Sequence, residues 1–214
     1  GLATGLSPGT TTIIASSGSI SGNTSLTVRD VNPPVIGAVS NVTVEATGAS
    51  GAVATFALPS ATDDFDPSPV VTASPASGST FPLGTTTVMV TATDAAGNSS
   101  TKTFTVTVQD TTAPVLTVPL AISREATAPL TPVALGQATA MDLVDGAVAV
   151  TNNAPPAGFP IGTTLVAWSA TDSRGNTATA TQSVTITDTT TPALSVPADI
   201  TKEATAPLTP VVLG

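Results

Sequence analysis

Carboxylates are the main chemical resource of this chain. Its 214 residues include fourteen Asp and Glu against five Lys and Arg, a net charge of −9, and there is neither cysteine nor histidine. Without thiol or imidazole groups, most transition-metal chemistry is excluded. Carboxylate and amide oxygens are instead the ligands that Ca²⁺ prefers in proteins, so the positions of the acids carry the functional signal.

Most of the acids lie in motifs that recur 78 residues further along the chain. Asp94 opens the segment Asp-Ala-Ala-Gly-Asn, and Asp172 opens the matching segment Asp-Ser-Arg-Gly-Asn. Segments 110–136 and 188–214 are identical at 19 of 27 aligned positions. A repeat of this length indicates a tandem array of one structural module.

The period divides the chain into four segments, of which two are complete modules. We expect the C-terminal strands of an incomplete immunoglobulin-like repeat at 1–29, full modules at 30–109 and 110–187, and the N-terminal strands of an incomplete third copy at 188–214. The chain starts without Met, so we expect it to be a segment of a longer protein.

Each full module reads as short strands joined by tight turns. In the first module, period-two alternation predicts strands at 41–45, 52–57, 70–73, 86–93 and 103–108. Glycines and prolines are spread between these segments, as turns require, and no helical periodicity is present. The sequence therefore predicts an all-β fold of tandem immunoglobulin/fibronectin-III-like β-sandwiches in an elongated array.

This fold would gather the acids at the ends of the modules. The chain enters a sandwich at the end that also carries the B–C and F–G loops, and the first strand runs about 30 Å to the opposite end. The predicted Ca²⁺ ligands are Asp30, Asp63, Asp64, Asp66, Asp94 and Asn98 in the first module, Glu45 with Asp110, Asp142, Asp145, Asp172 and Asn176 at the first junction, and Glu125 with Asp188 at the next.

A second interpretation of these acids stays open. Asp is a common turn residue whose carboxylate accepts hydrogen bonds from the backbone of its own loop, without any metal. Four or five carboxylates at one end of a module favour a cation, because like charges at close range raise one another's pKa values unless they are neutralised. The sequence alone supports a Ca²⁺ site at each junction as a hypothesis.

Several motifs carry a family resemblance. Val-Glu-Ala-Thr at 44–47, Phe-Pro-Leu-Gly at 81–84, Asp-Ala-Ala-Gly-Asn at 94–98 and Thr-Phe-Thr-Val at 103–106 together resemble the hyalin repeat (HYR) domain. The resemblance covers residues 30–214 and implies a seven-stranded sandwich of extracellular and adhesion proteins, although the family's cysteine pair is missing. Leu-Ser-Pro-Gly-Thr at 6–10 and Ile-Ser-Gly-Asn-Thr at 20–24 resemble the end of a bacterial immunoglobulin-like (Big-type) repeat.

Composition argues against several classes of function. Five scattered basic residues cannot neutralise a phosphate backbone, so no nucleic acid is expected, and no apolar run is long enough to insert into a membrane. Asp142 and Asp145 share one short loop without aromatic residues around them, which does not suit a glycosidase pair. We therefore expect no enzyme activity.

Three functions remain after these exclusions. The first is a stalk or spacer segment of a secreted or cell-surface protein, stiffened by Ca²⁺ and packed against neighbouring repeats of the same protein. The second is a filament subunit completed by strands from other copies of the chain, since an unpaired sandwich edge is a template for strand addition. The third is an adhesive module, for which Phe65 is the one aromatic residue expected to be exposed.

Overall fold

The regular structure of this chain is entirely β. A computed structural model describes residues 5–196 and 198–203, and every regular element among them is a strand. The chain forms two compact units, of which the first comprises residues 1–118, 137–152 and 168–180, and the second residues 119–136, 153–167 and 181–214. Within the described part, no helix is long and apolar enough to span a membrane.

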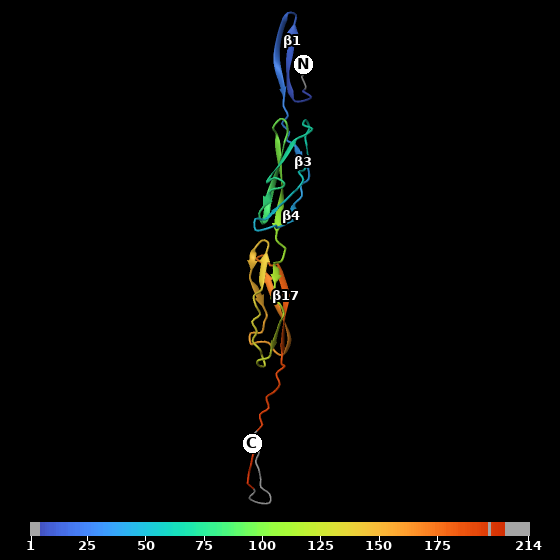
Figure 1. Cartoon of the computed structure of the whole chain (residues 1–214). Helices are drawn as coiled ribbons and strands as arrows, with labels where there is room; N and C mark the ends of the chain where they lie inside the picture. The colour runs from blue at the N-terminus through green and yellow to red at the C-terminus, as the bar shows by residue number, and fades with distance from the viewer. Residues whose placement is uncertain (1–4, 197, 204–214) are drawn as a thin grey trace. The chain divides into compact units, whose positions relative to one another are not determined.

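The first unit begins with a β-hairpin. Strands β1 (Gly9–Ser17) and β2 (Ile20–Val28), blue in Figure 1, pair antiparallel along their whole length. Gly18 has φ of +63°, a conformation that a two-residue hairpin turn favours at its first central position. The ladder runs without interruption from Gly9 opposite Val28 to Ser17 opposite Ile20.

The first full module has one large sheet and two strand pairs. Strands β4, β10, β9 and β7 form the large sheet in that order, while β3 pairs with β6 and β5 with β8. The strands are β3 (Val35–Ile36), β4 (Val42–Glu45), β5 (Ala52–Val53), β6 (Ala61–Thr62), β7 (Val70–Ser74), β8 (Thr80–Phe81), β9 (Gly84–Thr93) and β10 (Ser99–Gln109).

The core of this module follows from the alternation in its two long strands. Val88 of β9 lies opposite Phe104 of β10, and both are buried. Phe56 packs edge-on against Phe104, with ring centroids 4.9 Å apart, and also contacts Phe81 from the smaller sheet. Apolar side chains from both layers thus form one core, as in a β-sandwich.

One predicted strand is much shorter in the structure. The sequence pattern predicts a strand at 52–57, but β5 ends at Val53. The hydroxyl of Ser77 takes the place of a partner strand at Phe56, because it accepts from the backbone N–H and donates to the carbonyl oxygen, each at 2.8 Å. A side chain that satisfies the backbone in this way competes with a strand ladder.

Strand β4 ends beside the end of β10, the last strand of the module. Strand β4 pairs parallel with β10, and Glu45 lies opposite Gln109 in that register. Glu45 is therefore placed next to the residues that leave the module, from Asp110 onward. The same relationship occurs in the second unit, where Glu125 of β12 (Ile122–Glu125) lies opposite Thr187 of β17 (Thr177–Thr187).

The second module repeats the strand order of the large sheet of the first, whereas its smaller layer differs. Its large sheet contains β12, β17, β16 and β15 in that order, and a three-stranded sheet contains β11, β13 and β14. The remaining strands are β11 (Val115–Thr117), β13 (Thr139–Asp142), β14 (Gly146–Val148), β15 (Val150–Asn152) and β16 (Gly162–Thr171). Trp168 of β16 is buried.

The second unit contains an unusual core residue. Gln182 occupies the position that corresponds to Phe104 and is only 2% exposed. Its side-chain amide donates to the carbonyl oxygens of Leu120 and Leu135, at 2.8 and 3.0 Å. These bonds satisfy polar groups that burial would otherwise leave unpaired.

The prediction of tandem β-sandwich modules is confirmed, whereas the third copy differs from expectation in its described part. Residues 188–196 and 198–203 form no strand. In the two full modules the corresponding strands β4 and β12 each pair with a strand about sixty residues later. The second expected strand of this copy, after residue 203, lies outside the described residues.

Candidate metal centre

Three aspartates meet where the chain enters the second module. Asp110 follows β10, Asp142 ends β13, and Asp172 follows β16. One carboxylate oxygen from each lies within 4.8 Å of the others. The three side chains, here called the Asp110 cluster, are 8%, 7% and 7% exposed, so three acidic groups share one buried space.

Hydrogen bonds from the local loops hold two of these carboxylates and leave one oxygen of each without a partner. Asp142 Oδ1 accepts from the backbone N–H groups of Val144 and Asp145, at 2.8 and 2.9 Å. Asp110 Oδ1 accepts from the N–H of Thr112 at 3.2 Å. The Oδ2 atoms of Asp110 and Asp142 are buried and accept no hydrogen bond. An unsatisfied buried carboxylate oxygen is costly, and a bound cation would remove that penalty.

Asp172 is held more completely. Its Oδ1 accepts from the N–H groups of Arg174 and Asn176, both at 2.8 Å, and its Oδ2 accepts from the Asn176 side-chain amide at 2.7 Å. Gly175, with φ of +93°, provides the turn that brings Asn176 back toward Asp172. The Asn176 amide also donates to the backbone carbonyl oxygen of Asp110 at 3.2 Å, which ties the entering chain to this loop.

The pKa values of two members of the cluster, Asp110 and Asp172, are shifted in opposite directions. Burial raises the pKa of Asp110, and the nearby charges of Asp142, Asp172 and Glu45 raise it further against the hydrogen bond from Thr112. Burial also acts to raise the pKa of Asp172, but hydrogen bonds from Asn176, Arg174 and Gly175 outweigh it, so the pKa is lowered. Hydrogen bonds thus stabilise the charged form of Asp172, whereas the charged form of Asp110 is disfavoured.

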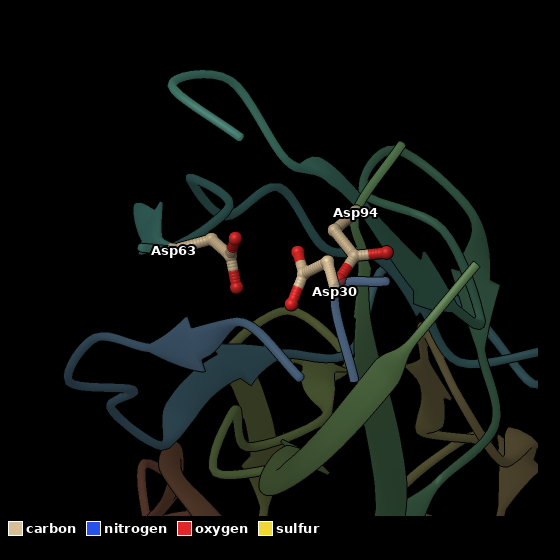
Figure 2. Close-up of side chains that lie close together, drawn as sticks. All are labelled: Asp30, Asp63 and Asp94. Atoms are coloured by element: carbon tan, nitrogen blue, oxygen red, sulfur yellow. The ribbon is translucent and has the colours of Figure 1, made fainter. Parts of the chain in front are cut away.

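A similar cluster lies where the chain enters the first module. Figure 2 shows Asp30, Asp63 and Asp94 pointing toward one another from three separate segments of chain, and an oxygen of each lies within 4.8 Å of the others. Asp63 Oδ1 accepts from two N–H groups of its own loop, as Asp142 does. Asp30 and Asp63 are only half-buried, so water can reach this cluster more easily than the Asp110 cluster.

The asparagines of the two F–G loops act on these clusters through hydrogen bonds. The amide nitrogen of Asn98 donates to Asp94 Oδ2 at 2.8 Å and to the carbonyl oxygen of Asp30 at 3.3 Å. Asn176 makes the equivalent pair of bonds to Asp172 and Asp110. The structure thus uses these amides to fix the carboxylates, while their role as metal ligands stays a prediction.

Three other predicted ligands connect loops and lie outside both groups of three. Asp66 Oδ2 accepts from the N–H of Ala95 at 2.9 Å, and Asp64 Oδ2 accepts from the Asn32 amide at 3.3 Å. Asp145 accepts from the N–H and the hydroxyl of Ser173, at 2.6 and 2.9 Å, and the hydroxyl bond followed by the N–H bond lowers its pKa. In this structure these three carboxylates already have hydrogen-bond partners.

Glu45 lies near the Asp110 cluster but makes contacts of its own. Its carboxylate accepts from the Thr111 N–H at 2.7 Å, the Thr111 hydroxyl at 2.8 Å and the Thr112 hydroxyl at 2.9 Å. Sequence reasoning missed these two threonines. The signal that could have found them is the recurrence of Asp-Thr-Thr at 110–112 and 188–190. In each module a Glu earlier in the chain, Glu45 or Glu125, ends a strand.

The next junction shows the same contacts without a cluster. Glu125 accepts from the Thr189 N–H at 2.6 Å, the Thr189 hydroxyl at 3.1 Å and the Thr190 hydroxyl at 3.2 Å. Asp188 is exposed, and its Oδ1 accepts from the Thr190 N–H at 3.1 Å. Within the described residues, neither acid belongs to a group of three carboxylates.

Comparison with known proteins agrees with the motifs. The HYR domain family matches residues 29–108 and 109–186. The chain is 37% identical over 179 residues to hyalin of Lytechinus variegatus and 36% identical over 156 residues to hyalin of Strongylocentrotus purpuratus. These alignments cover 78% and 70% of the chain but only 34% and 13% of the two relatives. The Big-type resemblance of residues 1–29 stays a prediction.

Solved structures of similar outline are distant. Extracellular cadherin domains 1–3 of protocadherin gamma C5 share 16% identity and a TM-score of 0.36, over 78% of this chain and 72% of that one. Domains 3–6 of protocadherin gamma B2 share 19% identity and a TM-score of 0.36, over 79% and 56%. A likeness at this level bears on neither ligands nor function.

Proposed function

The chain belongs to the HYR domain family, and from this premise we propose that it is a structural stalk or spacer segment of a larger secreted or cell-surface protein. HYR domains are extracellular, adhesion-related modules. The proposal assigns no catalysis to these acids. The matched relatives are much longer than this chain, which suits a segment of a larger protein.

The proposal includes a Ca²⁺ ion at the Asp110 cluster. The observation that carries it is the pair of buried carboxylate oxygens, Asp110 Oδ2 and Asp142 Oδ2, that accept no hydrogen bond. Ca²⁺ binds oxygens at about 2.3–2.6 Å, so two ligands on opposite sides of one ion lie about 4.8 Å apart. Three carboxylate oxygens within 4.8 Å of one another are therefore close enough to share one ion.

Ca²⁺ suits this site better than Mg²⁺. The ligands come from a linker and two loops, a source of variable geometry that Ca²⁺ tolerates and that Mg²⁺, with its strict octahedral shell, does not. A cation bound here would join the linker residue Asp110 to Asp142 and Asp172 of the second module. It would thereby restrict the freedom of the chain between the two modules, which is the mechanical role proposed.

Calorimetric titration tests the metal directly. CaCl₂ titrated into the chelator-treated chain should give saturable heat, and MgCl₂ should bind more weakly. Asp142→Asn removes one charge from an unpartnered carboxylate and should lower Ca²⁺ affinity at least about 10-fold. Asp199→Asn makes the same charge change at an exposed residue and should leave it unchanged. Absence of saturable heat in the unsubstituted chain would overturn the Ca²⁺ proposal.

The N-terminal hairpin supports the filament subunit as a second candidate. Strands β1 and β2 have exposed apolar residues, with Ile14 68% and Ile20 78% exposed. A two-stranded sheet is marginally stable alone, and strands from another copy could cover it. Light scattering after size exclusion would decide, because a filament subunit should give masses above 20.8 kDa that rise with concentration.

A further inference from the structure

Glu45 lies at the end of the first module, and its hydrogen bonds reach the residues that follow Asp110. It ends β4 opposite Gln109, the last residue of β10, and Asp110 follows directly. Its carboxylate accepts three hydrogen bonds from Thr111 and Thr112, while the Thr112 N–H donates to Asp110 Oδ1. We call Glu45, Thr111 and Thr112 the Glu45 clamp.

We propose that the Glu45 clamp is a positioning device that holds Asp110 in the geometry needed to bind Ca²⁺ in the Asp110 cluster. This inference rests on the Ca²⁺ site proposed above. Glu45 acts in it through Thr111 and Thr112, to which both of its carboxylate oxygens are hydrogen-bonded.

The backbone on both sides of Asp110 supports this role. Residue 109 is held by the strand register and by its carbonyl oxygen, which accepts from the Ala46 N–H at 2.8 Å. Residues 111 and 112 are held by Glu45. Asp110 is thus fixed between two attachments to the same strand end, with its own carbonyl oxygen bonded to Asn176. Groups that orient a metal ligand in this way commonly change metal affinity by about 10–100-fold when removed.

The chain also contains a matched control. Glu125 makes the same three bonds to Thr189 and Thr190, so its contacts with the chain resemble those of Glu45. Asp188, which corresponds to Asp110, is exposed and belongs to no group of three carboxylates among the described residues. Loss of Glu125 therefore removes an equivalent clamp without touching the proposed site.

Three variants separate the positioning effect of Glu45 from the effect of its charge. Glu45→Gln removes the charge but keeps oxygen and amide groups that can bond to Thr111 and Thr112, whereas Glu45→Ala removes the contacts as well. The double variant Thr111→Val with Thr112→Val keeps the Glu45 charge and removes both hydroxyl donors. These threonines are exposed, so the exchange does not disturb the core.

Calorimetric titration with CaCl₂ of the whole chain provides the test. We expect Glu45→Ala to weaken binding about 10-fold or more, Glu45→Gln to weaken it by only a few-fold, the double Val variant to weaken it with the charge intact, and Glu125→Ala to leave it unchanged. Raising the salt concentration should reduce the Gln effect, which is electrostatic, more than the Ala effect.

Other outcomes overturn the inference. Equal losses in Glu45→Ala and Glu45→Gln would mean that charge alone acts, and wild-type affinity in Glu45→Ala would mean that the clamp does not position Asp110. A loss in Glu125→Ala as large as that in Glu45→Ala would mean a general effect on the fold. If the unsubstituted chain binds no Ca²⁺, the proposed site itself fails, and this result is distinct because it appears before any substitution.

Discussion

The side-chain amide of Asn176 donates a hydrogen bond to the backbone carbonyl oxygen of Asp110, 3.2 Å away. The two residues are 66 positions apart, and the bond connects the chain entering the second module with a loop near that module's end. Asn98 and Asp30 have the same relationship in the first module, at 3.3 Å. The acid clusters are therefore parts of a polar joint that is repeated in the two modules.

Removal of this joint should destabilise the second module. Asn176→Ala deletes the donors to Asp110 and to the carboxylate of Asp172. Loss of a hydrogen bond to a charged group typically costs about 1.5–3 kcal/mol. Urea unfolding followed by the fluorescence of Trp168, the single tryptophan, measures the loss. Asn23→Ala, on the exposed face of the hairpin, should leave this transition unchanged.

The raised pKa of Asp110 predicts a particular pH dependence in the absence of metal. Burial, followed by the charges of Asp142, Asp172 and Glu45, raises this pKa above the ordinary value of 3.8. The folded state then binds the proton more tightly than the unfolded state, so this group favours the fold in acid and disfavours it once pH exceeds the folded pKa.

Asp110→Asn is the variant that isolates this contribution. In chelator, Asp110→Asn should be more stable than the unsubstituted chain at pH 7, and this advantage should shrink as pH falls through the folded pKa toward 3.8. Urea unfolding at several pH values measures the difference. An advantage that does not vary with pH would contradict the assigned cause.

The sequence predicts the long strands well because their alternation reflects burial directly. Val88, Val90 and Ala92 alternate with outward residues along β9, and each is fully buried. The shorter layer is harder to predict, since at Phe56 the hydroxyl of Ser77 satisfies the backbone in place of a neighbouring strand. A side-chain contact between residues 21 positions apart leaves no periodic pattern in the sequence.

The site shows the same contrast between pattern and detail. The 78-residue period locates the acid-rich ends, but it cannot tell Asp142 from Asp145, which occupy one loop. Asp142 turns its Oδ2 into the cluster because its other oxygen accepts two N–H bonds, while Asp145 turns toward Ser173. Which carboxylate faces inward depends on turn geometry, and the spacing of the acids does not specify it.

The pKa of Glu125 is shifted in the opposite direction from that of Asp110. The Thr189 N–H, followed by the two threonine hydroxyls, lowers its pKa below the ordinary value of 4.5 despite some desolvation. Its contribution to stability is therefore present above pH 4.5 and is lost as pH falls through the folded pKa. NMR titration of the Thr189 amide resonance should show a midpoint below 4.5. Thr189→Val should move that midpoint upward, and an unmoved midpoint would contradict the hydroxyl's part in the shift.

The buried Gln182 supplies the final prediction. Gln182→Leu increases the apolar character of the core, and at most core positions such a change would be tolerated. Here it removes the donor to the carbonyl oxygens of Leu120 and Leu135. Each lost hydrogen bond typically contributes about 0.5–1.5 kcal/mol, so we expect Gln182→Leu to lower the free energy of unfolding, measured by urea unfolding followed at Trp168.

The corresponding position in the first module gives the comparison. Phe104 packs against Phe56 and holds no carbonyl group in the same way, so Phe104→Leu keeps an apolar side chain among apolar neighbours. Phe104→Leu should lower the free energy of unfolding through lost packing, because the smaller side chain leaves space beside Phe56. If Gln182→Leu were instead stabilising, packing would outweigh hydrogen bonding at this site, and the two amide bonds would contribute little to the stability of the module.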